Sequence, residues 1–188
     1  MTTQSTPRER LLDTAGELFH RGGVNVGVET LCKAAGVSKK SMYQLFRSKD
    51  EVIAESLARL GPSYQALLLP AVDDGRTPRE RMLHVFKRQD EVVADGKYLG
   101  CPLVSTAIEL KNAEHPGSVV ARRLKQELTD FFESEAAAAG ARDPELLAQQ
   151  LTIVFDGASA RAVVRAQSLD GVGVTTAAAL LEAAGVAA

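Results

Sequence analysis

The sequence contains few of the residues from which metal sites, disulfide frameworks and catalytic centres are built. Its 188 residues include two cysteines, three histidines and no tryptophan. Cys32 and Cys101 lie far apart, and the first falls within a helical core pattern, so a disulfide framework is not indicated. The chain has no His-x-x-x-His or Cys-x-x-Cys spacing, no phosphate-binding glycine loop and no nucleophile elbow. We therefore expect no enzyme, no metal site and no cofactor.

Long apolar runs are also missing. No stretch approaches the length that spans a membrane, and the N-terminus lacks the apolar segment of a signal peptide. Hydrophobic residues nevertheless make up 45% of the chain, which is enough to form a core. We expect a folded, soluble, cytoplasmic protein with no membrane partner.

Nearly every boundary in the sequence is typical of a helix. Thr6-Pro-Arg-Glu and Thr77-Pro-Arg-Glu each combine an N-cap, a first-turn proline and an acid at the third position, and Ser48 with Glu51 forms a similar box. Because no alternating strand pattern is present, we predict an all-α fold. Proline should kink or break the helix that contains Gly61-Pro62. Later helices are expected near 102–113, 116–139, 144–168 and 173–185.

Residues 28–46 predict a helix-turn-helix. The first helix has apolar residues at the i, i+3, i+4, i+7 spacing of one face, and Gly36 follows it where a helix favours positive φ. Ser38 is a good N-cap for the second helix, in which we expect Met42, Leu45 and Phe46 to pack inward. Outward-facing side chains would then include Lys39, Lys40, Tyr43, Gln44 and Arg47. Such a face suits a phosphate-lined groove, although a merely solvated basic face is the alternative.

The charge distribution favours DNA binding although the net charge is −2. Residues 1–50 hold eight Lys or Arg and five Asp or Glu, a net charge of +3, whereas residues 51–188 have a net charge of −5. The positive charge therefore lies with the helix-turn-helix. We predict a DNA-binding domain at 1–50 and a helical domain for effector binding and dimerisation at 51–188.

The first 50 residues resemble the TetR family of bacterial transcriptional repressors. The matching features are a first helix ending at Gly22-Gly23, then Ala34-Ala35-Gly36-Val37-Ser38-Lys39, Met42-Tyr43-x-x-Phe46 and Ser48-Lys49-Asp50-Glu51. The resemblance implies a two-fold dimer with a three-helix DNA-binding head, a palindromic operator and a larger helical bundle that binds a small effector. It also implies a repressor that the effector releases from DNA.

Residue roles are carried over position by position. Lys49 matches the family's phosphate-contacting lysine and Tyr43 its backbone-contacting tyrosine, while Lys40 and Gln44 are our candidates for base contacts. The chain departs from the family pattern at Gly27, where a capping Ser or Thr is usual, and Thr30 could replace the lost phosphate contact. The full set of predicted DNA-binding residues is Thr30, Ser38, Lys39, Lys40, Ser41, Tyr43, Gln44 and Lys49.

The remainder of the chain is less specific. Helices near 144–168 and 173–185 carry many small and apolar residues, so we expect a homodimer through them; completing a monomer core is the alternative. Candidate effector-binding residues are Phe86, Tyr98, Cys101, Leu103, Phe131 and Phe155, each of which core packing explains equally well. Control by protein partners, or by oxidation or alkylation of Cys101, is the alternative to a small effector.

Overall fold

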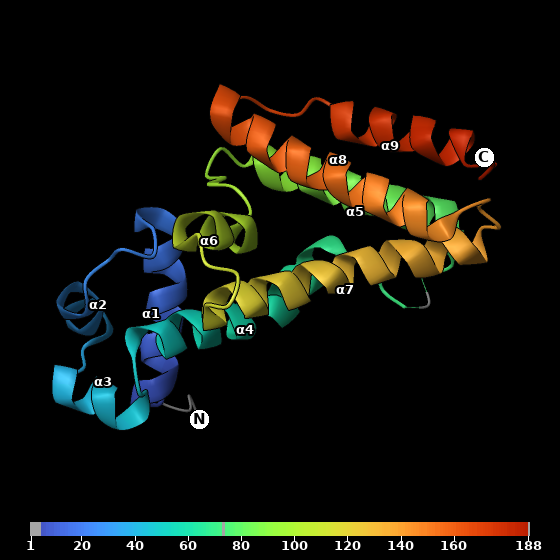
Figure 1. Cartoon of the computed structure of the whole chain (residues 1–188). Coiled ribbons are helices and arrows are strands. Elements are labelled where there is room, and N and C mark those ends of the chain that lie inside the picture. Colours follow the sequence, from blue (N-terminus) through green and yellow to red (C-terminus); the bar gives the residue numbers. More distant parts are fainter. Residues whose placement is uncertain (1–4, 73, 188) are drawn as a thin grey trace. The chain divides into compact units, whose positions relative to one another are not determined.

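The computed structural model describes residues 5–72 and 74–187, which form nine α-helices and no strand (Figure 1). The all-α prediction is therefore confirmed for this part of the chain. The helices are α1 (Pro7–Gly22), α2 (Val28–Ala35), α3 (Lys39–Leu45), α4 (Lys49–Leu68), α5 (Pro78–Ala94), α6 (Pro102–Leu110), α7 (Pro116–Ala138), α8 (Pro144–Arg165) and α9 (Val172–Ala183).

The chain divides into two compact units. The first comprises Met1–Pro62 and Pro102–Leu124, and the second comprises Ser63–Cys101 and Lys125–Ala188. Helix α6 and the start of α7 thus belong to the same unit as the helix-turn-helix. This division follows internal contacts and does not locate the end of the DNA-binding function, so the boundary at residue 50 stays a prediction.

Helices α1, α2, α3 and the start of α4 enclose the core of the first unit. Leu11, Leu31, Met42 and Val52 each have an exposed fraction of 0%. One predicted core residue is misplaced: Leu45 is 40% exposed, although Met42 and Phe46 are buried as expected. Leu45 is the last residue of α3, and Phe46 leaves the helix in an extended conformation, so the chain turns inward one residue later than the helical period predicts.

The predicted start signals operate as hydrogen bonds. In α1 the amide of Thr6 donates to Glu9 at 2.8 Å and the amide of Glu9 donates to the Thr6 hydroxyl at 3.2 Å. The same reciprocal pair starts α5. At α4 only half of the box forms, since the amide of Glu51 donates to Ser48 while the Glu51 carboxylate accepts from the amide and guanidinium of Arg47.

We expected a kink or a break at Gly61-Pro62, and helix α4 runs through Pro62 without a break. Gly61 has a packing role instead, because a Cβ at this position would lie 2.7 Å from a methyl carbon of Leu124. A larger residue at this position would force the Leu124 side chain to move.

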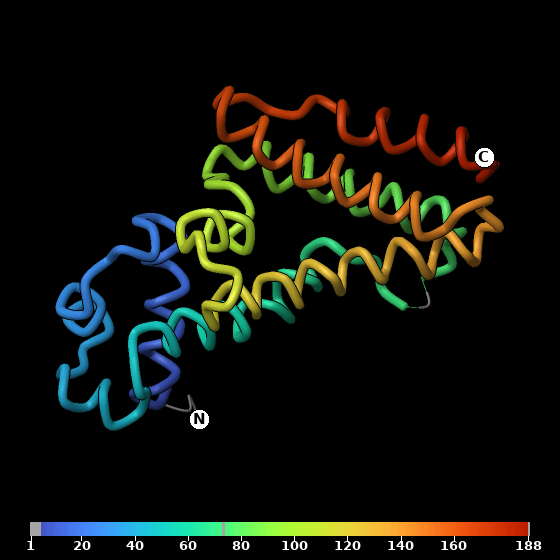
Figure 2. Tube along the Cα trace, in the orientation of Figure 1, coloured from blue at the N-terminus to red at the C-terminus, as the bar shows by residue number. Residues whose placement is uncertain are grey.

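In the second unit, α5, α8 and α9 lie side by side (Figure 2). Phe86, Phe132 and Phe155 are each no more than 1% exposed and form the centre of the core. The rings of Phe86 and Phe132 stack with their centroids 5.7 Å apart, and Phe155 meets Phe86 edge-on at 6.3 Å. The backbone carbonyl of Phe155 also takes part in the polar cluster described below.

No helix within residues 5–72 and 74–187 is long and apolar enough to cross a membrane.

Candidate functional site

The second helix of the helix-turn-helix presents a polar, basic face. Gly36 adopts the left-handed conformation at φ +64° and ends α2, and the Ser38 hydroxyl accepts from the amide of Ser41 at 3.0 Å to start α3. Lys40, Tyr43 and Gln44 are all exposed. The predicted outward face of α3 is therefore present.

Two of the predicted DNA-binding lysines contact other side chains of the protein. The ammonium of Lys39 lies 3.1 Å from the carboxylate of Glu29 on α2. The ammonium of Lys49 lies 5.9 Å from the centroid of the Phe19 ring, within the range of a cation–π contact. Each contact positions a lysine ammonium group at the surface of the first unit, and a DNA phosphate would compete with Glu29 or Phe19 for that group.

A hollow of about 370 Å³ lies beside the turn. Ser38, Ser41 and Gln44 line it from the turn and α3, and Arg10 lines it from α1. The structure thus brings three predicted DNA-binding residues into one concave surface, while Thr30 is exposed on α2.

Sequence reasoning missed Arg10 and Glu29 as neighbours of this surface. Neither lies on the face of α3, and Glu29 is ten residues away from its partner Lys39. Helical periodicity reports neighbours three or four residues apart, so it gives no signal for a contact across the turn.

A polar cluster lies inside the apolar core of the second unit. Gln89 of α5 is 2% exposed, and its Nε2 donates to the carbonyl oxygen of Phe155 and to the hydroxyl of Ser159, both at 2.8 Å. The bond to a carbonyl fixes which end of the amide carries the donor. The amide oxygen Oε1 is buried and has no donor among the described residues.

Two tyrosines and a cysteine of the same unit extend this cluster. The hydroxyl of Tyr98 shares a hydrogen bond with Ser159, and burial raises the pKa of Tyr98 to about 12. The hydroxyl of Tyr64 donates to the Cys101 sulfur at 3.4 Å. Burial, followed by the neighbouring Cys101, raises the pKa of Tyr64. Both phenols therefore stay protonated at neutral pH and can donate.

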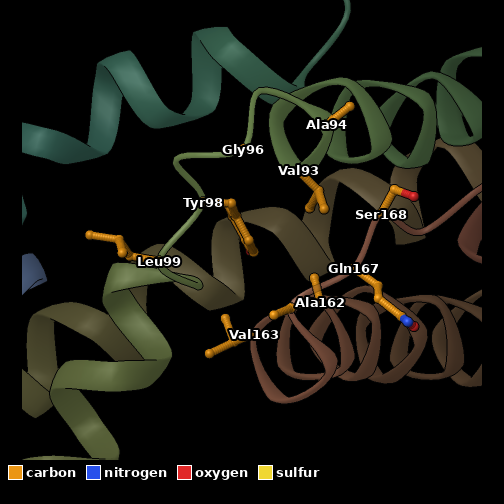
Figure 3. Close-up of a pocket in the computed structure, with 10 residues that line it drawn as sticks. Val93, Ala94, Gly96, Tyr98, Leu99, Ala162, Val163, Gln167 and Ser168 are labelled. Atoms are coloured by element: carbon orange, nitrogen blue, oxygen red, sulfur yellow. The ribbon is translucent and has the colours of Figure 1, made fainter.

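A hollow of about 360 Å³ adjoins Tyr98 (Figure 3). Val93 lines it from α5, Leu99 from the following loop, and Ala162 and Val163 from α8. The hollow combines an apolar wall with a tyrosine, which is a composition suited to a small organic molecule.

The six predicted effector-binding residues do not form one group. Tyr98 and Cys101 take part in the polar cluster, and Phe155 contributes its carbonyl to it. Phe86 belongs to the aromatic core, and Phe131 packs beneath the Arg81 guanidinium at 5.8 Å. Leu103 is buried and belongs to the first unit.

Gln89, Ser159 and Tyr64 were missed by sequence reasoning, although Gln89 offered a signal. It occupies a core position of the apolar stripe of α5, with Phe86 and Val93 on either side. A glutamine on a buried stripe is unusual enough to mark a polar site.

An apolar face of α8 and α9 is exposed in the single chain. Ile153 is 70% exposed and Val164 is 83% exposed on α8, and Val172 is exposed on α9. Gly157 and Ala160 lie exposed between the two α8 residues, at the spacing of one helix face.

No group of three or more metal-binding side chains occurs in the part of the chain that the structure describes. Both cysteines are buried, and their thiols are free.

Comparison with known proteins identifies the helix-turn-helix. The family model for bacterial regulatory proteins of the tetR family matches residues 11–55. A structure from Streptomyces avermitilis, assigned to the TetR transcriptional regulators, is 52% identical, covers 97% of this chain and 100% of its own, and has a TM-score of 0.94.

Curated relatives are more distant. The HTH-type transcriptional regulator YjdC of Escherichia coli is 23% identical over 87% of this chain and 86% of its own length. The HTH-type transcriptional repressor NemR of the same organism is 31% identical over 57% of this chain and 56% of its own length. The structure of reduced E. coli NemR, at 21% identity and a TM-score of 0.76, shares the fold.

Near-complete coverage at 52% identity, together with the matched helix-turn-helix, shows that the chain belongs to the TetR family of DNA-binding transcriptional regulators.

Proposed function

We propose that this regulator is a repressor that leaves its operator when a small molecule binds in the second unit. The observation that supports an effector is the buried amide oxygen of Gln89, which has no donor among the residues described. Leaving such an acceptor unpaired costs about 1–3 kcal/mol, and a ligand with an N–H or O–H group would remove that cost. Tyr98 and Ser159 would supply further hydrogen bonds, and the hollow beside Tyr98 gives space for an apolar portion.

The DNA contacts are proposed as follows. Gln44 and Lys40 reach base edges, since Gln can bond adenine through two hydrogen bonds and Lys can bond guanine. Lys39, Tyr43 and Lys49 contact phosphates, and Thr30, Ser38 and Ser41 support them through hydroxyl groups. Lys39 must exchange Glu29 for a phosphate when DNA binds.

TetR regulators dimerise, and we propose that the exposed apolar face of α8 and α9 forms the interface here. A dimer buries Ile153 and Val164, which water surrounds in the single chain. Two-fold symmetry then pairs two recognition helices with a palindromic operator. Ile153→Asp should yield monomers in analytical ultracentrifugation, whereas Val72→Asp, a change at another exposed apolar residue, should leave the dimer intact.

The central experiment selects bound DNA from random sequence and then screens small molecules for release of the selected DNA. Repression with an effector predicts a palindromic consensus and at least one compound that lowers affinity for it. Gln89→Leu should abolish that release while leaving operator affinity unchanged. If the compound still releases DNA from the Gln89→Leu variant, the proposed effector site is wrong. If the regulator bound to this consensus recruits polymerase in transcription assays, the protein is not a repressor.

Control through Cys101 is the second candidate, favoured by the hydrogen bond that Tyr64 donates to its sulfur. Under this alternative, N-ethylmaleimide should release DNA from the full-length protein and from Cys32→Ser but not from Cys101→Ser. DNA release that persists in Cys101→Ser would exclude it. Control by a protein partner predicts neither response.

A further inference from the structure

The corner between α6 and α7 holds a polar hollow that the DNA-binding and effector functions do not use. It has a volume of about 310 Å³, and all of its lining residues belong to the first unit. They are Ala107, Lys111, Asn112, Ala113, Ser118 and Arg122.

Ser118 supplies a hydrogen-bond donor without an acceptor. Its side chain is nine-tenths buried, since the residue is only 7% exposed, and its hydroxyl oxygen has no partner in residues 5–72 and 74–187. A serine inside a helix can donate to the carbonyl four residues earlier. Ser118 is the third residue of α7, so that residue, Glu114, precedes the helix, and Ser118 instead lines the hollow.

Two positive side chains line the same hollow. The Lys111 ammonium makes no ion pair with any residue that the structure describes, and one terminal nitrogen of Arg122 donates to the Ala113 carbonyl at 2.8 Å. No lining residue is acidic. Water solvates the exposed side chains of Lys111 and Arg122, whereas an anion in the hollow would contact both of them and Ser118 at once.

The start of α7 adds to the positive potential. This helix has 23 residues, and its N-terminus carries a partial positive charge. Pro116 has no N–H group, and the amide of Gly117 is already bound, because it donates to Nδ1 of His115 at 3.0 Å. Helix N-termini favour anions, and here a buried hydroxyl donor and two cations accompany the helix end.

We propose that this corner binds a small oxyanion, of the phosphate or carboxylate class. An oxyanion accepts from the Ser118 hydroxyl and pairs with Lys111 and Arg122 at the same time, which matches every polar group that lines the hollow except Asn112. The volume accommodates inorganic phosphate or a small phosphorylated or carboxylated metabolite. The site is independent of the proposed effector site, which lies in the other unit.

The test is a titration of the ¹⁵N-labelled full-length protein without DNA, followed by the amide shifts of residues 107–122. Inorganic phosphate and acetate are added in separate series, with sodium chloride keeping the ionic strength constant. We expect saturable shifts at this corner with phosphate, acetate or both, and the stronger of the two defines the ligand class. Shifts that grow linearly and without saturation in both series overturn the proposal, because they would show only a general effect of the added salt.

Variants localise the binding. Ser118→Ala and Lys111→Gln should each weaken binding of the preferred anion by about tenfold or more, because hydrogen bonds to charged groups exceed neutral ones. Lys87→Gln, which removes the same charge from the exposed surface of α5, should change it less than about twofold. Lys111 is exposed, so its variant remains informative if Ser118→Ala does not fold. Equal effects of Lys111→Gln and Lys87→Gln would show that only general charge matters and would reject the site.

Discussion

Replacing Gln89 by leucine tests whether this residue serves ligand binding or the stability of the fold. The side chain is buried among apolar residues of the second unit. Its amide nitrogen makes two hydrogen bonds of 2.8 Å, and its amide oxygen makes none with the described residues. If the glutamine serves the fold, leucine should destabilise the protein; if it serves a ligand, leucine should not.

The magnitudes favour the second outcome. The two bonds contribute about 0.5–1.5 kcal/mol each, while the unpaired oxygen costs about 1–3 kcal/mol. A buried leucine adds about 1–2 kcal/mol from its larger apolar surface. The carbonyl of Phe155 still has its helical partner, and Ser159 still has Tyr98. We therefore expect Gln89→Leu to be as stable as the unaltered protein or up to about 2 kcal/mol more stable.

Urea denaturation followed by circular dichroism measures this difference. Both proteins must be compared at one protomer concentration, because dimer stability depends on it. Gln89→Ala is the matched control: it also removes the unpaired oxygen but leaves a cavity, so it should lose about 1–3 kcal/mol. A loss of more than about 2 kcal/mol in Gln89→Leu would refute the reasoning and make the amide a structural group.

Three further predictions concern other parts of the chain. Lys49→Ala should weaken binding to all DNA sequences and reduce the slope of log affinity against log salt concentration by about one, whereas Gln44→Ala should change sequence preference. Both variants are measured by fluorescence anisotropy over a salt series. An unchanged slope in Lys49→Ala would contradict the phosphate contact. Burial raises the pKa of Asp90, although the amide of Gly171 partly opposes this, so ionisation of Asp90 lowers stability. The gain from Asp90→Asn in urea denaturation should then be largest near neutral pH and shrink as the pH falls through the folded-state pKa of Asp90; a constant gain would contradict the shift. Gly36→Ala should cost about 1 kcal/mol in thermal unfolding, because φ is +64° and the added Cβ meets nothing within 4 Å; an unchanged Tm would show that the turn relaxes.

Local signals predicted the helices and the turn accurately. Thr6 with Glu9, and Ser38 with Ser41, act through atoms at most three residues apart, so the sequence itself contains both partners. Gly36 is similar, since its left-handed conformation is a property of one residue. The helix-turn-helix is therefore encoded in short-range patterns, which is why sequence alone suffices to locate it.

Pro62 shows where a local rule fails. Proline removes one backbone donor and crowds the preceding turn, which led us to expect a kink or a break. Helix α4 continues because its flanks are held by tertiary packing: Val52 and Ile53 are buried at one end and Leu68 at the other. Gly61 before it was interpreted with the same rule, yet its role is the close contact with Leu124, which is 63 positions later and invisible to a local pattern.

The proposed effector site was the hardest part to predict because its members come from four separate segments. Gln89 and Ser159 are 70 residues apart, and Tyr64 and Cys101 are 37 apart, so no spacing connects them. Four of the six candidates are aromatic, but any core requires large apolar residues, and Phe86 serves the core. A polar residue on a buried stripe is the more discriminating signal, since burial penalises it unless a partner is provided. Gln89 meets that criterion from the sequence alone, and its buried amide oxygen has no donor among the described residues.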